Sequence, residues 1–548
     1  MDLKKILLSC VFVVSVLLLW DRYQAQEAGS LSTTKASVAD SRLTGDVPDR
    51  PALATTELPA AAAATAPTGS LASGERLTVA TDVFEADIDS NGGDLRRVVL
   101  LRHREAGVGG KPLTLLDDGP RPYVAQSGLI GADMPNHRSS FEPEPGQLKL
   151  ADEAAAVELA LRHASDTLDV RKVYTFRRDE YVVNVRFEVT NRGTQVVDTA
   201  GYFHVLRDGL SPDGESWLQH TYTGPVVYTA ADKFRKIDFD SVRSGKADYA
   251  RQARDGWVAL IQHYFLSAWL PKAGALREYY IDALPDGLYR AGVKTPAVRI
   301  EPGATETIAM DLYIGPQEQD RLAELADGLD LVTDYGWLTI IAKPLFWLLS
   351  LFNDWTDNWG LAIILLTLLV KAVFYPLSAA SYRSMAKMRV LAPKLQALKE
   401  RFGDDKQRMQ VEMMNLYKTE KINPLGGCLP ILVQIPVFIA LYYALIASVE
   451  LRHAPFYGWI TDLSAPDPYY ILPVLMGISM IVQTRLNPTP PDPIQARIMQ
   501  IMPIVFSVFF FFFAAGLVLY WLVNNVISIA QQWRMNVVME REKANPRR

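Results

Sequence analysis

Hydrophobic and polar positions follow two different patterns in two parts of the chain. Between residues 75 and 330, apolar and polar residues alternate in short runs that end at glycine, asparagine or aspartate. The clearest run extends from Tyr181 to Thr190 and stops at Asn191-Arg-Gly193. Alternation with a period of two, bounded by turn residues, predicts strands with one buried face. Its repetition across the region predicts a large antiparallel β-sandwich.

After residue 335 the apolar residues form long runs instead, which cover 359–377, 425–449, 469–486, 498–513 and 517–532. Such runs predict helices that cross a bilayer, whose hydrocarbon core is about 30 Å thick. The last two runs would together make one helix of about 52 Å, which is too long for a single crossing. We therefore expect Ala514-Ala515-Gly516 to form a tight turn between two antiparallel spans.

Three further segments complete the predicted organisation. Residues 1–22 carry Lys4, Lys5 and an apolar run without a good cleavage site, which favours an uncleaved signal anchor. Residues 23–74 are rich in Ala, Thr, Ser and Pro and predict a flexible linker. Within 331–356, the apolar run is short, edged by tryptophans and interrupted by Lys343-Pro344. This pattern favours an amphipathic helix that lies in the membrane interface.

The polar insert 378–424 predicts a helical hairpin with one apolar seam, because its apolar residues recur at three- and four-residue spacing on both sides of Gly403-Asp-Asp. Methionine-rich surfaces suit apolar segments of varied sequence. The candidate contacts for an incoming chain are Met385, Met388, Arg389 and Met413. Packing within the seam is the alternative, and we favour it for the methionines.

Basic residues predict the topology. Lysine and arginine outnumber acids in the hairpin, and the tail 536–548 is also basic. The positive-inside rule then places both termini, the hairpin and the tail in the cytoplasm and the β-domain on the outer side of the membrane. Six spans satisfy this arrangement, whereas a seventh through 331–356 would move the hairpin outside. The tail is interpreted as a topology signal, with a ribosome contact as the alternative.

Composition excludes several classes of function. The chain has 548 residues, is 49% hydrophobic and carries a net charge of -5. Cys10 and Cys428 both lie in or beside apolar segments, so no disulfide framework is expected. The seven histidines form no zinc motif, and the phosphate-binding loop pattern is missing. We expect no cofactor, no metal, no bound nucleotide and no enzymatic activity.

The candidate chemistry lies inside the apolar runs. Lys371 interrupts the run 359–377, where a cation costs several kcal/mol unless it finds water or polar partners. Other polar or amphipathic residues occur in neighbouring runs, and Trp521, Asn525, Ser528 and Gln532 share one helical face. Because polar groups in lipid need partners, we predict a shared hydrophilic groove. Its candidate residues are Lys371, Thr367, Gln434, Gln483, Tyr520, Trp521, Asn525 and Ser528.

Simpler interpretations remain open for these residues. The long side chain of Lys371 could snorkel to the cytoplasmic interface, since Pro376 follows five residues later. Tyr520 and Trp521 could pack between helices. Asn525 and Gln434 could form interhelical hydrogen bonds worth roughly 0.6 kcal/mol each.

Several longer motifs are similar to those of the YidC membrane-protein insertase family. They begin at Ser384 (Ser-Met-Ala-Lys-Met-Arg-Val-Leu-Ala-Pro-Lys), Gly403 (Gly-Asp-Asp-Lys-Gln-Arg), Asn423 (Asn-Pro-Leu-Gly-Gly-Cys-Leu-Pro), Asp467 (Asp-Pro-Tyr-Tyr-Ile-Leu-Pro) and Gly516 (Gly-Leu-Val-Leu-Tyr). The resemblance covers residues 335–535 in unbroken order. The anchor, linker and outer β-domain resemble the Gram-negative members in arrangement.

The resemblance implies an insertase and chaperone in the bacterial inner membrane, with a five-helix core over 357–535. Its expected partners are nascent inner-membrane proteins, the Sec translocon, the lipid bilayer and the ribosome. The groove cation of the family is usually arginine, and the matching position here is Lys371. Lysine keeps the charge without the planar fork, which favours plain electrostatic attraction over a bidentate clamp. Trp521 matches the aromatic residue that faces the cation in relatives.

Two other classes of function stay open at this point. Polar residues inside apolar runs also mark solute transporters, although no inverted repeat is evident among the runs. The β-domain could instead serve as an anchored carbohydrate-binding or sugar-isomerising module, although no paired carboxylate and histidine set supports this.

Overall fold

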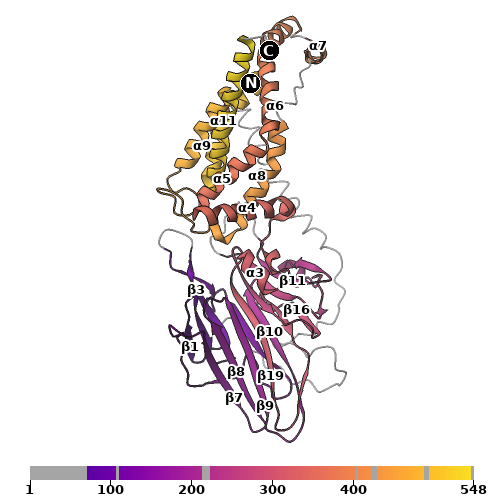
Figure 1. Ribbon diagram of the computed structural model, residues 1–548. Coiled ribbons are helices and arrows are strands. Elements are labelled where there is room, and N and C mark those ends of the chain that lie inside the picture. Colours follow the sequence, from indigo (N-terminus) through magenta and orange to yellow (C-terminus); the bar gives the residue numbers. More distant parts are fainter. Residues whose placement is uncertain are drawn as a thin grey trace. The chain divides into compact units, whose positions relative to one another are not determined.

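The computed structural model describes residues 71–548 except 106–109, 213–221, 403–404, 421–428, 487–492 and 545–548. The predicted anchor over 1–22 and nearly all of the predicted linker over 23–74 lie outside the described residues. The description below follows the chain from the strand-rich region to the helical region (Figure 1).

The strand-rich region forms two antiparallel sheets. The first sheet follows the order β1-β2-β3-β5-β10-β17-β16-β13, with β4 paired to β3 and β18 paired to β10. Its strands are β1 (Arg76–Ala80), β2 (Phe84–Asp89), β3 (Asp94–Arg104), β4 (Pro112–Leu116), β5 (Tyr123–Ile130), β10 (Val197–Asp208), β13 (Gln252–Ala253), β16 (Arg277–Ala283), β17 (Leu288–Lys294) and β18 (Val298–Ile300).

The second sheet follows the order β12-β11-β14-β15-β19-β9-β8-β7-β6. Its strands are β6 (Glu142–Pro143), β7 (Ala156–Ala164), β8 (Leu168–Arg177), β9 (Val182–Asn191), β11 (Gly224–Thr229), β12 (Lys233–Lys236), β14 (Trp257–Gln262), β15 (Phe265–Leu270) and β19 (Thr305–Pro316). A short helix, α2 (Phe239–Arg243), follows β12.

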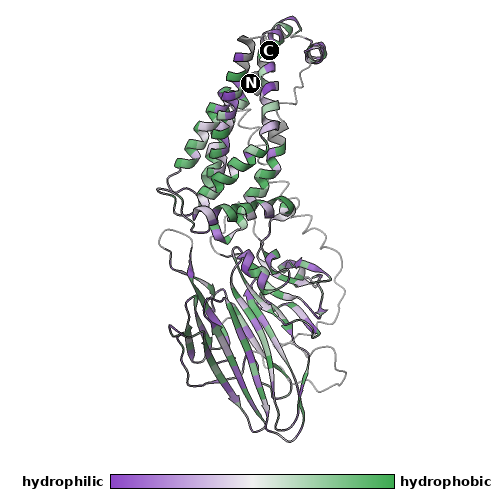
Figure 2. Cartoon of the chain, viewed as in Figure 1, coloured by the Kyte–Doolittle hydropathy of each residue, from purple (hydrophilic) through white to green (hydrophobic). Residues whose placement is uncertain are grey.

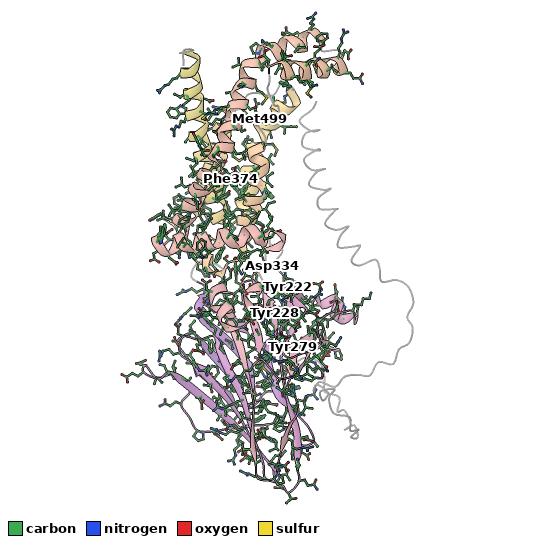
Figure 3. The ribbon with its side chains drawn as sticks, turned by 45° about the vertical axis from the view of Figure 1, so that its right-hand side comes forward. Tyr222, Tyr228, Tyr279, Asp334, Phe374 and Met499 are labelled. Atoms are coloured by element: carbon green, nitrogen blue, oxygen red, sulfur yellow. The ribbon has the colours of Figure 1, made fainter. Side chains whose placement is uncertain are left out.

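The two sheets pack face to face, as the sequence pattern predicted. Phe203 on β10 of the first sheet lies 5.2 Å from the ring of Trp269 on β15 of the second. The Tyr123 hydroxyl also donates a hydrogen bond to Ser267 Oγ across the two layers at 3.0 Å. Tyr279, labelled in Figure 3, is likewise fully buried in this core. The antiparallel β-sandwich is therefore confirmed.

Strand β9 shows how the alternating pattern produces this core. Val183, Val185, Phe187 and Val189 are all fully buried, while the residues between them are partly exposed. Successive side chains of a strand point to opposite faces, so these four reach the space between the sheets. Asn191 ends the strand, and its side-chain oxygen accepts a hydrogen bond from the Gly193 amide at 2.9 Å.

The connection between β2 and β3 requires glycine. Gly92 has a φ of 79°, a region that side chains with a Cβ rarely adopt. A Cβ at this position would lie 2.4 Å from the backbone oxygen of His137. The pair Gly92-Gly93 therefore permits both the left-handed turn and the close approach of the 137 loop.

The helical region begins with α3 (Gln319–Leu325), two 3₁₀ turns, η1 (Leu329–Val332) and η2 (Gly336–Leu338), and α4 (Thr339–Thr356). The long apolar runs then form α5 (Trp359–Val373), α8 (Leu429–Ala447), α9 (Ile471–Leu486), α10 (Pro493–Phe509) and α11 (Ala515–Ala544). Helices α6 (Tyr375–Phe402) and α7 (Lys406–Thr419) correspond to the predicted hairpin. In Figure 2, α5, α8 and α9 are mainly hydrophobic, whereas α7 is mainly hydrophilic.

The helix expected over 359–377 is broken. Helix α5 ends at Val373, Phe374 forms a turn, and α6 continues at an angle of 65°. Pro376 contributes to this break because it has no backbone N–H to donate and disfavours a helical residue before it. Phe374 is labelled at the break in Figure 3.

Length and hydropathy single out no unbroken helix in the described residues as able to cross a bilayer. The bent pair Trp359–Val373 and Tyr375–Met388 meets both criteria when taken together. Shorter apolar helices cover Val433–Ala447, Ile471–Leu486 and Ala496–Phe512.

The last two apolar runs are separate helices, as predicted. After α10, the 3₁₀ turn η5 (Phe510–Phe512) leads to Phe513, whose backbone is extended. Ala514 then bridges to Pro466, and the Gly516 amide donates to the Leu463 oxygen at 2.9 Å. The break lies one or two residues before the expected Ala514-Ala515-Gly516, because α11 already begins at Ala515.

Helix α4 presents large apolar side chains outward. Ile340, Trp347 and Trp355 are 88%, 64% and 70% exposed, whereas Leu349 on the opposite side is fully buried. An exposed apolar face with tryptophans is typical of helices in a membrane interface. The cluster that α4 covers includes Ala362 and Ile363 of α5.

Candidate functional site

The ammonium group of Lys371 lies at the centre of a polar network inside the helical region. Lys371 is the third residue from the C-terminal end of α5 and is 7% exposed. The helix starts at a capped end, since Asn358 Oδ1 accepts a hydrogen bond from the Leu361 amide at 3.0 Å. The fifteen residues of α5 carry this charge past an apolar stretch into the bundle.

Two other helices supply the hydrogen-bond partners of this cation. Lys371 Nζ donates to Ser528 Oγ on α11 at 2.7 Å. A longer contact of 3.5 Å joins Nζ to Gln434 Oε1 on α8. The side chain therefore points into the bundle, and the structure does not support the interpretation that it snorkels to an interface.

A second set of hydrogen bonds holds these partners in place. Gln434 donates from Nε2 to Asn524 Oδ1, and Ser528 Oγ donates to the Asn524 backbone oxygen at 2.7 Å. The hydroxyl of Tyr382 on α6 donates to the Ser528 backbone oxygen at 3.4 Å. Tyr382 was missed in the sequence because its position before the seam of the hairpin indicated no link to α11.

The hydrogen-bond partners of Lys371 among the described residues are all neutral. Within the described residues, no carboxylate forms an ion pair with its ammonium. A buried cation that has only dipoles as partners is poorly compensated, and a carboxylate next to it is strongly favoured. The electrostatic environment of Lys371 therefore favours the binding of an anionic group.

The polar stripe of α11 divides between two neighbours. Ser528 and Asn524 face α5 and α8, as described above. Asn525 instead donates to Ser479 Oγ on α9 at 3.2 Å, and Gln532 donates to the Leu486 oxygen at 3.1 Å. These contacts match the interpretation of Asn525 as interhelical glue.

Two other groove candidates, Thr367 and Gln483, form no hydrogen bond with the Lys371 ammonium within the described residues. Thr367 is 1% exposed, and its hydroxyl donates to the Ile363 backbone oxygen of its own helix at 2.6 Å. This intrahelical bond is common for threonine inside helices. Gln483 is half-buried on α9, and within the described residues it makes no hydrogen bond to the Lys371 network.

Tyr520 and Trp521 lie in an aromatic cluster. The Trp521 ring packs edge-on against Phe438 at 4.6 Å and lies 5.4 Å from Phe510. Tyr520 stacks with Phe438 at 6.1 Å, and its hydroxyl lies close to the Gln434 side chain. Trp521 precedes Ser528 by seven residues, or about 10 Å along the helix. Trp521 therefore lies about two turns along α11 from Ser528, the residue that binds Lys371.

Of the hairpin candidates, Met385, Met388 and Arg389 lie on α6 and Met413 lies on α7. Leu391 is buried, and Met385, Met388 and Met413 are half-buried. The Arg389 side chain lies outside the described residues. An ion pair joins Lys394 Nζ of α6 to Glu420 Oε1, the residue directly after α7, at 2.6 Å. Part of each of these methionines is therefore accessible.

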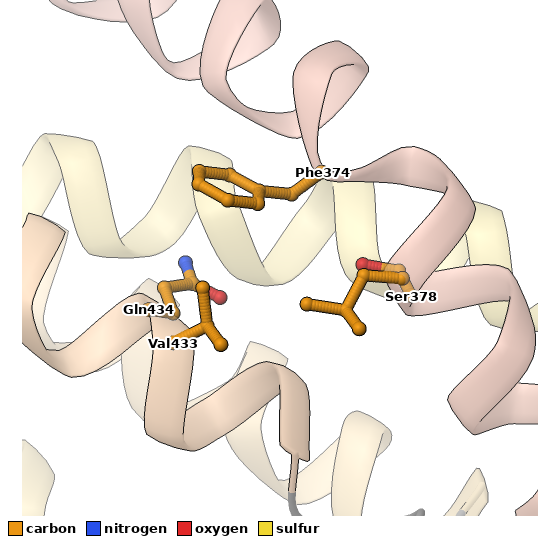
Figure 4. A pocket seen from close by; sticks show the side chains of 5 residues that line it. Phe374, Ser378, Val433 and Gln434 are labelled. Carbon is orange, nitrogen blue, oxygen red and sulfur yellow. The ribbon is translucent and has the colours of Figure 1, made fainter.

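A hollow opens next to the cation. It is lined by Phe374, Leu377 and Ser378 from the α5–α6 break and by Val433 and Gln434 from α8 (Figure 4). The hollow is small, with a cavity volume of about 20 Å³, which is room for about one water molecule. Gln434 belongs both to this hollow and to the ligands of Lys371, so the two features adjoin.

Comparisons with known proteins identify the family. A profile described as "YidC periplasmic domain" matches residues 76–348, and one described as "60Kd inner membrane protein" matches residues 351–543. The membrane protein insertase YidC of Nitrosospira multiformis is 51% identical to this chain, with 100% of this chain and 99% of the relative covered. The YidC of Methylobacillus flagellatus is also 51% identical, with 100% of both chains covered.

A crystal structure of an active YidC insertase with its first transmembrane domain resolved is 20% identical, with a TM-score of 0.40. The similarity covers 85% of this chain and 93% of that chain. The sequence matches extend over the whole length at about half of all positions. This chain belongs to the YidC family of inner-membrane proteins with a periplasmic domain.

Proposed function

We propose that this chain is an insertase and chaperone that helps nascent inner-membrane proteins enter the bilayer and fold. The observation that carries the proposal is the buried ammonium of Lys371, whose hydrogen-bond partners among the described residues are the neutral side chains of Ser528 and Gln434. Such a group can attract a polar or acidic flank of an incoming chain. No bond is made or broken in this process, so the activity is not enzymatic.

The flank exchanges water for the polar groups beside Lys371. The charged part of the flank thereby avoids bare hydrocarbon, in which an acidic residue at the centre of a helix costs about 2.5–3.5 kcal/mol. Completing the insertion is favourable because each apolar residue of the following segment releases about 0.3–0.6 kcal/mol of free energy when it enters the bilayer centre. Over a segment of about 20 residues, this gain drives insertion without a nucleotide.

The proposed topology has six spans with both termini in the cytoplasm. The basic hairpin of α6 and α7 and the basic tail support a cytoplasmic position for these parts. The β-sandwich lies in the periplasm, and α4 lies along the outer interface with Trp347 and Trp355 toward lipid. The domain limits are those expected above, with the core over 357–535.

The proposed partners are nascent membrane proteins, the Sec translocon and the ribosome. The basic hairpin is the first element that a chain leaving the ribosome would meet on the cytoplasmic side. The half-buried Met385, Met388 and Met413 offer it polarizable apolar contacts, with Arg389 as a neighbouring charge. The groove is formed by Lys371, Gln434 and Ser528 with the surrounding polar residues.

Reconstitution tests the proposal directly. The purified full chain in liposomes is expected to make a small membrane protein resistant to added protease, which empty liposomes do not do. Uptake of small solutes by the same liposomes is expected to stay at background. Solute uptake without protein insertion would contradict the proposal and favour a transporter.

A further inference from the structure

The segment that follows α8 joins the helical region to the β-sandwich. It contains the 3₁₀ turn η4 (Val449–Leu451). Val449 is 3% exposed and belongs to the apolar core of the sandwich, whereas Leu451 is fully buried in the core of the helical region. Glu450, between these two residues, therefore lies at the joint of the two cores.

Hydrogen bonds tie the sandwich to the helical region on both sides of η4. The Nε2 atom of His263, in the turn between β14 and β15, lies 3.0 Å from the backbone oxygen of Ile446 in α8. The Nε2 atom of His453 lies 3.2 Å from the backbone oxygen of Arg104 at the end of β3. Separating the sandwich from the helical region would therefore break both contacts and expose η4 to water.

The carboxyl group of Glu450 is buried in this joint without a cation. Within the described residues, its Oε2 atom has no hydrogen-bond partner. The amide of Gln319, at the start of α3, donates to the carboxyl group. The other groups that face it are the carboxyl groups of Glu318 and Asp320 and the hydroxyl of Tyr335. A buried acid among acids is strongly favoured in its protonated, neutral form.

Two arginines of the joint have other neighbours. Arg321 Nε lies 3.6 Å from Glu318 Oε2. The guanidinium of Arg452, two residues after Glu450, lies over the rings of Tyr264 and Phe265, at 5.9 Å and 5.4 Å from their centres. Within the described residues neither arginine forms an ion pair with Glu450, so the charge of an ionised Glu450 would stay uncompensated.

The pKa of Glu450 reflects these surroundings. Burial, with the charges of Glu318 and Asp320 adding to its effect, raises the pKa of Glu450 from 4.5 to about 7. Burial also raises the pKa of Glu318. When water reaches the Glu450 carboxyl group in an opened joint, its pKa returns toward 4.5. The closed joint therefore binds this proton more tightly than the open joint does.

We propose that Glu450 is a proton-operated latch between the β-sandwich and the helical region, closed when its carboxyl group is protonated and loosened when that group ionises. Ionisation adds a negative charge beside Glu318 and Asp320, in a buried place without a counter-ion, and so opposes closure. The latch contributes its full stabilisation below pH 4.5 and loses it as the pH rises to about 7. In the proposed topology the controlling proton comes from the periplasm.

Two histidines near Arg452 respond to pH in the opposite direction. Burial, with Arg452 nearby, lowers the pKa of His103 and that of His263 from 6.5 to about 4. Acid below about pH 6.5 therefore opposes closure through them, because a histidine that becomes exposed in the open joint takes up a proton there. A variant that keeps both histidines is needed to isolate the contribution of Glu450.

Hydrogen exchange measures the opening of the joint. In the full chain, exchange of the amides of residues 449–452 is followed by mass spectrometry from pH 5 to 7.5, and each rate is divided by that of the unfolded peptide at the same pH. Glu450→Gln removes the titrating group and keeps the shape of the side chain. Glu324→Gln is the matched control, because Glu324 is an exposed residue of α3 and its replacement changes the net charge equally.

Relative to Glu450→Gln, opening of the unmodified chain and of Glu324→Gln is expected to rise about 50-fold from pH 5 to 7.5, as pKa values of 4.5 in the open joint and about 7 in the closed joint require. The same pH dependence in the unmodified chain and in Glu450→Gln would overturn the inference.

A second variant covers the case in which Glu450→Gln does not fold. Glu318→Gln removes a carboxyl group that faces Glu450, and it is expected to move the upper end of the pH response below 7. An unmoved response would overturn the inference. Neither measurement depends on insertion of a substrate, so a failure of the latch leaves the proposed function untouched.

Discussion

Neutralising Lys371 is the perturbation that isolates the electrostatic part of the account. Lys371→Met keeps an unbranched side chain of similar reach and removes the ammonium. Ser528 and Gln434 then lose a charged partner but keep their contacts with Asn524. The bundle is therefore expected to stay folded while the groove becomes neutral.

The magnitude follows from the geometry of the site. A carboxylate at about 4 Å from the ammonium gains about 4 kcal/mol at an effective dielectric constant of about 20, against about 1 kcal/mol in water. Displacing the contacts to Ser528 and Gln434 gives back on the order of 1 kcal/mol. The net preference of about 2 kcal/mol corresponds to roughly 30-fold in insertion rate.

Protease protection in liposomes measures this difference with two substrates that differ only by Asp or Asn in the translocated flank. Lys371→Met is expected to slow the Asp substrate by roughly 30-fold and the Asn substrate far less, and Lys371→Arg is expected to retain most of the rate. If Lys371→Met inserts the Asp substrate at the unmodified rate, the electrostatic reasoning is refuted.

Three further predictions concern stability and domain roles. Asp467→Ala removes the carboxylate that accepts hydrogen bonds from Trp459 Nε1 and from the amides of Tyr469 and Leu472. Thermal unfolding in detergent should show that the free energy of unfolding falls by about 2–3 kcal/mol, and by less for Asp467→Asn. An unchanged unfolding midpoint would contradict the account. Burial lowers the pKa of Lys172 from 10.5 to about 8 in the folded protein. Between pH 8 and 10.5 the unfolded chain therefore binds this proton more than the folded chain does, so the free energy of unfolding relative to Lys172→Met should rise with pH over this range. Parallel stability–pH profiles of the two proteins would contradict this. Deleting residues 80–320 should leave insertion of the Asp substrate largely intact, whereas its loss would assign an essential role to the β-sandwich.

The strands could be predicted because one face of each strand must be buried. The run from Tyr181 to Thr190 predicted β9 within a residue, since its valines alternate and Asn191 starts the turn. The order of the strands could not be predicted in the same way. β19 pairs with β9 across more than a hundred residues, and no local signal encodes that partner.

The helical region shows the same limit. Long apolar runs predicted the helices, but the break at Phe374 was missed because Pro376 was considered only for its distance from Lys371. The polar face of α11 was predicted from spacing, which cannot show that Asn525 and Ser528 contact different neighbours. Lys371, Gln434 and Ser528 were all identified in advance, because polar groups inside apolar runs are conspicuous. Their distances required the packed helices.

The most direct test of the account asks whether water reaches the surroundings of Lys371. In a chain without Cys10 and Cys428, a charged thiol reagent added from the cytoplasmic side of membrane vesicles is expected to label Gln434→Cys and Ser528→Cys. The lipid-facing control Ile478→Cys, at a position that is 53% exposed in the structure, should stay unlabelled. If neither Gln434→Cys nor Ser528→Cys is labelled in folded protein, water does not reach the site, and this result would contradict a hydrophilic groove.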